Sequence, residues 1–166
     1  MKELGIQEVP FGEAHWWEAA DAFRRFGKGR HAAGLNFGDC MTYAVARLVA
    51  SARCDLGIVV DGAGIGSAMT ANKVRGIRAA ACYNEALARN SREHNDANVL
   101  TLGAGQTSMD QARPVIDAFL NTECTEDRHR RRVRLIVDIE NGRMGDDAAP
   151  VAAGEAGLDL SPEDVE

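Results

Sequence analysis

A short apolar run followed by closely spaced glycines constrains the fold of this chain more than any other feature. Residues 56–60 are mostly apolar, and they lead into three glycines at alternate positions: Gly62, Gly64 and Gly66. An apolar run of this length is typical of a strand buried on both faces of a parallel sheet. The helix-prone residues 67–74 come next, so the pattern predicts a strand, a glycine turn and a helix.

The turn has a chemical consequence because a helix follows it. Backbone N–H groups at such a turn point outward at the carboxyl edge of the sheet, where an anion can bind. The alternate-glycine spacing is equally compatible with close packing of the strand against the helix. The spacing by itself therefore leaves both interpretations open.

The overall composition favours one α/β domain with a sizeable core. The chain has 166 residues and a net charge of −6, which argues against a general nucleic-acid binder. The cysteines are widely spaced without a Cys-x-x-Cys pair, as expected of reduced thiols in the cytoplasm. No apolar run approaches the ~20 residues of a membrane span, and the first residues lack a signal-peptide core. We therefore expect a cytoplasmic protein.

Apolar periodicity predicts further elements on both sides of the glycine turn. Strands are expected at residues 77–82 and 99–102, which with 56–60 would form a parallel, Rossmann-like sheet in a three-layer α/β fold. Helices are expected where apolar residues recur at helical spacing: residues 14–26, 36–53, 84–90, 109–120 and 128–140. Another short strand is expected within residues 4–11. Residues 141–166 have the acidic, Ala- and Gly-rich composition of a disordered tail.

Several short motifs fall in the order typical of one enzyme family. They are Asp61-Gly-Ala-Gly-Ile-Gly66, Ala71-Asn-Lys-Val74, Gly76-Ile-Arg-Ala-Ala80, Arg92-Glu-His-Asn-Asp-Ala-Asn-Val-Leu100, Ala118-Phe-Leu120 and Asp127-Arg-His-Arg-Arg-Arg-Val133. Residues 44–140 thereby resemble the family of ribose-5-phosphate isomerase B and galactose-6-phosphate isomerase. The resemblance implies aldose–ketose isomerisation of a phosphorylated sugar through an enediolate, in a homodimer and without a cofactor or metal.

The resemblance also implies roles for particular residues. The family has its general base at the first position of the glycine turn, where this chain has Asp61. His94 matches the ring-opening histidine, and Asn95 matches an asparagine that binds the enediolate. Arg128 and Arg132 match the phosphate-binding arginines and share one helical face. The turn glycines complete the expected substrate contacts: Gly62, Gly64 and Gly66.

The role of Asp61 depends on its surroundings. A carboxylate serves as a general base when partial burial raises its pKa toward the operating pH. The alternative is that Asp61 only accepts hydrogen bonds from the amides of the turn.

Two departures from the family pattern bear on activity. The family has a threonine where this chain has Ala63, so one hydroxyl is missing from the site. The family also begins with a strand ending in Ser-Asp-His-Ala-Gly, to which residues 1–53 contain no match. That strand lies beside the one that carries the glycine turn. Residues 56–60 are therefore expected at an open sheet edge, with residues 4–11 as a candidate cover.

The first part of the chain resembles a different family. The segments Val9-Pro-Phe11, Ala22–His31 and Gly34–Cys40 are similar to the C-terminal part of PIN-domain toxin ribonucleases. In that family, the acid at the position of Asp39 helps to hold a divalent metal. The other acids of such a site have no counterpart here, and one carboxylate does not make a Mg²⁺ site. We therefore expect Asp39 to start the helix at 36–53.

The two resemblances predict a chimeric organisation, whether from a natural fusion, a recombinant gene or a designed sequence. Residues 1–53 form a helical PIN-like piece, residues 54–140 an isomerase-like α/β core, and residues 141–166 an acidic tail. We expect the tail to be solvated, with a microcompartment-targeting helix as the alternative.

Three functional hypotheses follow from these resemblances. The leading hypothesis is an aldose–ketose isomerase (an intramolecular oxidoreductase) of the ribose 5-phosphate/ribulose 5-phosphate type, with impaired activity. The alternatives are an inactive sugar-phosphate-binding or dimerisation module and a ribonuclease fragment. Neither a membrane nor a nucleic acid is an expected partner.

Overall fold

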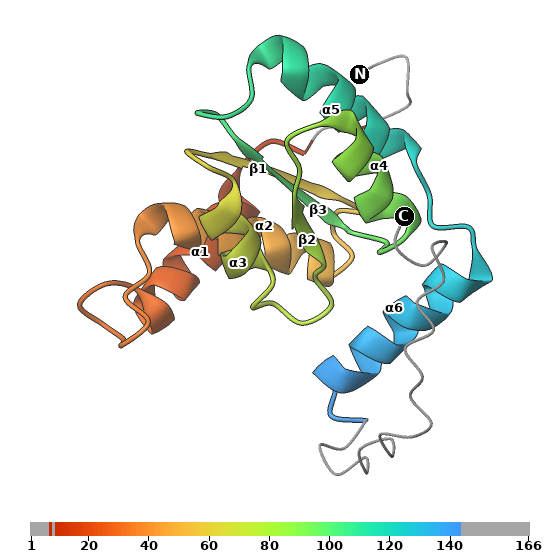
Figure 1. The fold of residues 1–166 in the computed structure, drawn as a ribbon. Helices are drawn as coiled ribbons and strands as arrows, with labels where there is room; N and C mark the ends of the chain where they lie inside the picture. The colour runs from red at the N-terminus through yellow and green to blue at the C-terminus, as the bar shows by residue number, and fades with distance from the viewer. Residues whose placement is uncertain (1–6, 8, 144–166) are drawn as a thin grey trace, which may run out of the picture.

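The computed structural model describes residue 7 and residues 9–143 (Figure 1). The helices are α1 (Glu13–Phe26), α2 (Phe37–Ala50), α3 (Ile65–Ala71), α4 (Glu85–Glu93), α5 (Met109–Asn121) and α6 (Asp127–Glu140). The strands are β1 (Gly57–Asp61), β2 (Ala79–Ala81) and β3 (Val99–Gly103). The predicted helices and parallel strands are confirmed, with boundaries that shift by a few residues. None of these helices combines the length and apolar character that crossing a membrane would require.

The three strands form one parallel sheet in the order β1-β3-β2, with β3 in the centre. Gly57 lies opposite Val99, and Asp61 lies opposite Gly103. Every residue of β3 is buried, as expected of a central strand with helices on both faces. β1 lies at an edge of the sheet, as predicted, and its Val60 side chain is 61% exposed.

β2 is shorter than the strand predicted at residues 77–82. Ile77 is buried in the core, but the chain turns at Gly76 (φ 81°) just before it. The N–H of Arg78 then donates to the side chain of Asn98 (2.8 Å) instead of to a neighbouring strand. Regular pairing therefore begins only at Ala79.

Helices cover both faces of the sheet and create two apolar cores. The core beneath α2 and α3 contains Ala46, Val49, Ala71, Val74, Ile77 and Val99. The core beneath α4 and α5 contains Cys82, Ala88, Ala97, Leu100, Leu102, Val115, Ala118 and Phe119. Figure 1 shows the two helix pairs on opposite sides of the sheet. The predicted three-layer α/β architecture is thus confirmed.

The two N-terminal helices form a hairpin in which α1 packs against the outer side of α2. Asn36 and Asp39 start α2 by reciprocal hydrogen bonds. The Asn36 side chain accepts from the N–H of Asp39 (2.9 Å), and the Asp39 carboxylate accepts from the N–H of Asn36 (3.1 Å). This is a capping box, so Asp39 has the helix-starting position that the sequence predicts.

Two further predictions concern the ends of the chain. The predicted strand at residues 4–11 is absent at residues 9–11, and residues 1–6 and 8 lie outside the described residues. Of the predicted disordered tail at 141–166, residues 144–166 lie outside the described residues.

The last helix, α6, projects from the body of the molecule at the lower right of Figure 1. His129 and Val133 are buried near its start. Apolar side chains farther along it are 43–62% exposed: Leu135, Ile136 and Ile139. The predicted helix at 128–140 is confirmed, but most of its apolar face has no cover within the described part of the chain.

Candidate functional site

The glycine turn lies at the carboxyl end of β1, immediately before α3. Asp61 is the last residue of the strand, and its carboxylate folds over the turn. Oδ1 accepts hydrogen bonds from the N–H groups of Ala63 (2.9 Å) and Gly64. Oδ2 accepts from the N–H (3.1 Å) and the hydroxyl of Ser67. The carboxylate therefore occupies the cluster of outward N–H groups where the sequence predicts an anion.

These contacts set the proton affinity of Asp61. Partial burial alone would raise the pKa of the carboxyl, but hydrogen bonds from Ser67, Gly64 and Ala63 outweigh it and hold the pKa below its ordinary value. The pKa of Asp61 is thus lowered in this chain rather than raised, and its role as general base stays a prediction. Asp61 has the geometry of a turn and helix cap, and it becomes a better proton acceptor only when some of these hydrogen bonds open.

Backbone conformation requires glycine at one of the three turn positions. Gly64 has φ +78°, and a Cβ there would lie 3.0 Å from the carbonyl carbon of Leu102. A Cβ on Gly62 would meet nothing within 4 Å, and one on Gly66 would meet only Asp61 Oδ2, at 4.0 Å. The substrate contacts expected of these glycines stay predictions.

Two side chains that sequence reasoning missed support the turn from the sheet. The hydroxyl of Thr101, in the middle of β3, donates to the carbonyl of Gly64 (2.6 Å). The hydroxyl of Tyr83 donates to the carbonyl of Ala63 (3.1 Å). A signal for each was present: Thr101 is a polar residue inside an apolar strand, and Tyr83 follows β2 at the edge of the sheet where the turn lies.

The other predicted site residues gather at the opposite end of the sheet. His94 and Asn95 follow α4 and precede β3, and α6 passes beside them. The guanidinium group of Arg132 donates to the backbone carbonyl of His94 and to Oδ1 of Asn95 (3.0 Å). Arg128 lies one turn earlier on α6. The structure thus brings His94, Asn95 and Arg132 into one cluster.

His129 belongs to this cluster, although sequence reasoning missed it. Its ring stacks on that of His94, with centroids 4.2 Å apart and ring planes 11° apart. The side chain is buried, and its Nε2 has no hydrogen-bond partner among the described residues. Burial, together with the nearby His94, Arg128 and Arg132, lowers the pKa of His129 against the opposing effect of Glu126. Its position between two predicted phosphate-binding arginines was the available signal.

A pocket of about 420 Å³ opens beside His94 along α4. It is lined by Glu85, Ala86, Arg89, Asn90, Glu93 and His94. The side-chain nitrogen of Asn90 lies 3.4 Å from Nδ1 of His94, which restricts the orientation of the imidazole. The pocket is large enough for a small polar molecule next to this ring.

The two groups of residues lie too far apart to act on one substrate within a single chain. Asp61 is the last residue of β1, at the carboxyl ends of the parallel strands, whereas His94 and Asn95 precede β3 at the amino ends. The five residues of β1 lie between these ends and span about 13 Å at 3.3 Å per residue. Proton transfer requires the donor and acceptor atoms to lie roughly 3 Å apart. One chain therefore contains two separate half-sites: the turn half-site around Asp61 and the α6 half-site around His94, Asn95 and Arg132.

Comparisons with known proteins identify relatives of this chain. The sequence pattern of the Ribose/Galactose Isomerase family matches residues 22–136. Ribose-5-phosphate isomerase B of Mycobacterium leprae is 36% identical over 157 residues, which cover 94% of this chain and 85% of that protein. The protein of the same name from Escherichia coli is 40% identical over 99 residues, which cover 60% of this chain and 66% of that protein. The chain thus spans about two thirds of the Escherichia coli relative.

A solved relative adds a structural match. The crystal structure of ribose-5-phosphate isomerase B from Mycoplasma genitalium with bound ribulose-5-phosphate has a TM-score of 0.59 at 33% identity. The match covers 69% of this chain and 76% of that one. At this identity and TM-score, the likeness extends beyond a shared α/β architecture.

These matches also bear on the predicted boundary between residues 53 and 54. The family pattern begins at residue 22, within the segment predicted to be ribonuclease-like. The PIN-domain resemblance receives no support, and Asp39 caps α2. Within residues 7 and 9–143, no three His, Cys, Asp or Glu side chains come together as metal ligands would. The chain belongs to the ribose/galactose isomerase family.

Proposed function

We propose that the protein interconverts a phosphorylated aldose and ketose of the ribose 5-phosphate type, in a site completed by a second copy of the chain. The observation that carries this proposal is the location of the two half-sites at opposite ends of one sheet. In a two-fold dimer, the α6 half-site of one copy can face the turn half-site of the other. The names of the relatives and the ribulose-5-phosphate bound to the Mycoplasma genitalium protein support the substrate class.

The reaction transfers hydrogen between neighbouring carbons of the sugar. A base removes a proton from one carbon, an enediolate forms, and a proton is returned to the adjacent carbon. One carbon is oxidised while its neighbour is reduced within the same molecule. The reaction consumes no external redox partner, so the protein is classed as an isomerase rather than an oxidoreductase.

Each half-site supplies different groups for this reaction. His94 exchanges a proton with the ring oxygen and opens the sugar, and the amide nitrogen of Asn95 donates to the enediolate oxygens. Arg128 and Arg132 bind the phosphate by charge-assisted hydrogen bonds. Asp61 of the other copy accepts the proton from carbon once substrate displaces part of its hydrogen bonding.

A second candidate function is sugar-phosphate binding without turnover. The turn half-site favours it, because the Asp61 carboxylate already accepts four hydrogen bonds and its pKa is lowered. Ala63 also removes the hydroxyl that the family has at this position. Neither feature weakens the arginines of the α6 half-site, so binding can persist where proton transfer does not.

Mixing two inactive variants tests the shared site. Asp61→Asn and His94→Ala should each lose turnover of ribose 5-phosphate. After subunit exchange, an equimolar mixture should regain about one quarter of the wild-type activity per chain, because half of the dimers are mixed and each of these has one intact site. The double variant mixed with either single variant is the control, since no dimer in it has an intact site.

The outcomes separate the two candidates. Recovery on mixing supports a shared catalytic site, and an active protein that sediments as a monomer contradicts it. Calorimetric binding of ribose 5-phosphate by a wild-type protein without turnover selects the binding module instead.

A further inference from the structure

The turn that carries His94 and Asn95 is closed by a residue with an uncommon backbone conformation. Asp96 has φ +45°, in the left-handed region that favours glycine. Its N–H donates to the carbonyl of Arg92 (3.0 Å), which ends α4 with a left-handed cap. An aspartate adopts this conformation when its surroundings stabilise it.

The carboxylate of Asp96 bridges two arginines from different parts of the chain. Oδ2 accepts from Arg78 Nη2 (2.9 Å), and Oδ1 accepts from Arg92 Nη1 (3.2 Å). The Arg78 side chain is 22% exposed and the Arg92 side chain 12%, so both guanidinium groups are largely withdrawn from water. Ion pairing is stronger in such a setting than on an open surface.

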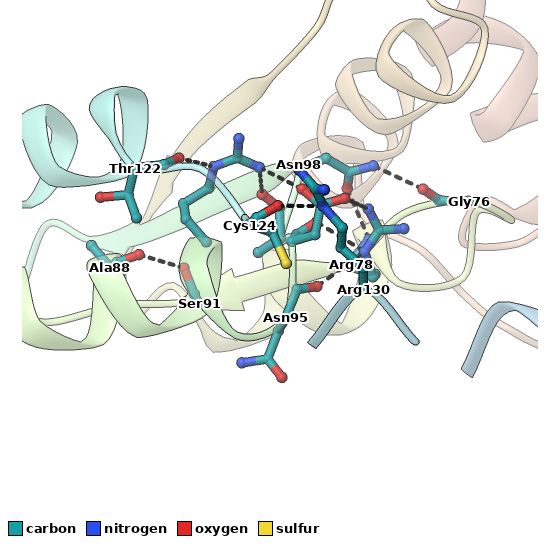
Figure 2. A network of polar contacts seen from close by, with 12 residues as sticks. Gly76, Arg78, Ala88, Ser91, Asn95, Asn98, Thr122, Cys124 and Arg130 are labelled. Atoms are coloured by element: carbon teal, nitrogen blue, oxygen red, sulfur yellow. Dashed lines mark hydrogen bonds and ion pairs between the residues drawn. The ribbon is translucent and has the colours of Figure 1, made fainter. Parts of the chain in front are cut away.

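The same arginines hold the backbone of the turn. Arg78 Nε donates to the carbonyls of Asn95 (3.2 Å) and Asp96 (2.9 Å). Arg92 Nε donates to the carbonyl of Thr122, just beyond α5 (3.1 Å). Figure 2 shows Thr122, Asn95 and Arg78 as parts of one network of contacts. The turn is therefore tied to the start of β2 and to the end of α5, as well as to α4.

This turn presents two predicted site residues to α6. Asn95 accepts a hydrogen bond from Arg132 (3.0 Å), and His94 stacks on His129. Both residues directly precede Asp96 along the chain. A change in the backbone at Asp96 would therefore move both side chains relative to α6.

We propose that Asp96 is a positioning residue, which by bridging Arg78 and Arg92 holds His94 and Asn95 against α6 in the geometry that the reaction requires. It acts through these neighbours and does not contact the substrate. Its effect on turnover rests on the proposed isomerase function, whereas its effect on the geometry of the α6 half-site does not.

Three variants separate the parts of this arrangement. Asp96→Asn keeps the shape and the tolerance for left-handed φ but loses the charge, and Asp96→Gly relieves the backbone while removing the carboxylate. Arg78→Lys keeps a charge but loses the planar fork that reaches the carboxylate and the carbonyls together. The matched control is Asp21→Asn in α1. Asp21 also bridges two arginines, Arg24 and Arg25, and is similarly exposed, at 36% against 42% for Asp96.

The first readout is the pKa of His129, measured by NMR titration, because it does not require turnover. In the wild type, burial and the neighbouring His94, Arg128 and Arg132 keep this pKa below its ordinary value, and Glu126 opposes them. Displacement of the turn separates the two stacked rings and admits water. The pKa of His129 should then rise toward its ordinary value.

This rise is expected in both Asp96 variants and, to a smaller extent, in Arg78→Lys. Asp21→Asn should leave the pKa of His129 unchanged. If the Asp96 variants fail to fold, Arg78→Lys carries the test. A folded set of variants in which the pKa does not change overturns the proposal, even when activity or Tm falls, because Asp96 would then only stabilise the fold.

The second readout is turnover of ribose 5-phosphate. Asp96→Asn should lower kcat/KM by about 100-fold, the loss typical of a misplacement near 1 Å, and mainly through kcat. KM should change little, because the arginines of α6 remain, and Asp21→Asn should keep wild-type values. A wild-type protein without turnover would contradict the proposed function, and the His129 titration would then decide the positioning role by itself.

Discussion

The two half-sites differ in how completely their polar groups are paired. In the turn half-site, Asp61 accepts four hydrogen bonds from its own turn and from α3. In the α6 half-site, His129 has a buried Nε2 without a hydrogen-bond partner among the described residues. Buried polar groups are normally paired, so the Nε2 of His129 is available to a water molecule, a ligand or a partner. Under the proposed function, binding and proton transfer depend on different ends of the sheet and can be lost separately.

The largest expected effect tests whether Asp61, although hydrogen-bonded within its turn, acts as the general base. Asp61→Asn should lower turnover of ribose 5-phosphate by about 10²–10⁴-fold, as expected for removal of a general base. Affinity measured by calorimetry should change little, because the arginines proposed to bind the phosphate lie in the other half-site. Turnover that survives the substitution would show that Asp61 only caps the turn and that the turn half-site does not supply the general base.

A pair of glycine variants tests how rigid the turn half-site is. Gly64→Ala should lower the free energy of unfolding by about 3 kcal/mol, because alanine would enter the left-handed region and press on the backbone of Leu102. Gly62→Ala places its methyl group in open space and should change that free energy by less than about 0.5 kcal/mol. Urea denaturation measures both values. Equal losses would contradict the close packing of Gly64 against β3.

A matched pair of arginine variants tests the α6 half-site. Arg132→Ala should weaken ribose 5-phosphate binding by about 10–100-fold, since it removes a charge-assisted hydrogen bond. Arg131→Ala, at the exposed neighbouring position, should change affinity by less than about 2-fold. Calorimetry at fixed ionic strength gives both constants. Equal losses would indicate a general positive field on α6 instead of a defined phosphate site.

The smallest expected effect concerns the pH dependence of stability. Because folding lowers the pKa of Asp61, its hydrogen bonds stabilise the fold above the ordinary carboxyl pKa, about 3.9, and this contribution is lost as pH falls through the lowered value. Denaturation midpoints measured from about pH 5 downward should therefore fall more steeply for the wild type than for Asp61→Asn. Parallel curves would show that the hydrogen bonds around Asp61 do not stabilise its ionised form.

Local signals in the sequence were sufficient to predict most helices and strands. The apolar run before the glycine turn predicts β1, and Asn36 marks the start of α2 through its contact with Asp39. Such features depend on residues only a few positions apart. Boundaries were wrong where a distant group competes with the local pattern. β2 starts late because Asn98, 20 residues away, takes the N–H of Arg78.

The candidate site was likewise harder to predict where it depends on contacts between residues far apart in the sequence. His94, Asn95 and Arg132 were identified through a family resemblance, and the structure brings them together, while their roles stay predictions. The stack of His129 on His94 depends on how α6 docks, which periodicity does not reveal. The separation of the half-sites was open to prediction from strand direction, because Asp61 ends β1 whereas His94 precedes β3.

The central position of β3 also sets the order in which the sheet can assemble during synthesis. β1 and β2 do not pair with each other. Each pairs only with β3, which is the last of the three strands to be synthesised. At about 5–20 residues per second, a ribosome that has completed residue 61 needs roughly 2–8 s to reach residue 103. During that time α2, made earlier, can cover one face of β1, but the edge of β1 that pairs with β3 in the folded protein is still open. The nascent chain is therefore more exposed to pairing with a neighbouring chain than the folded protein is.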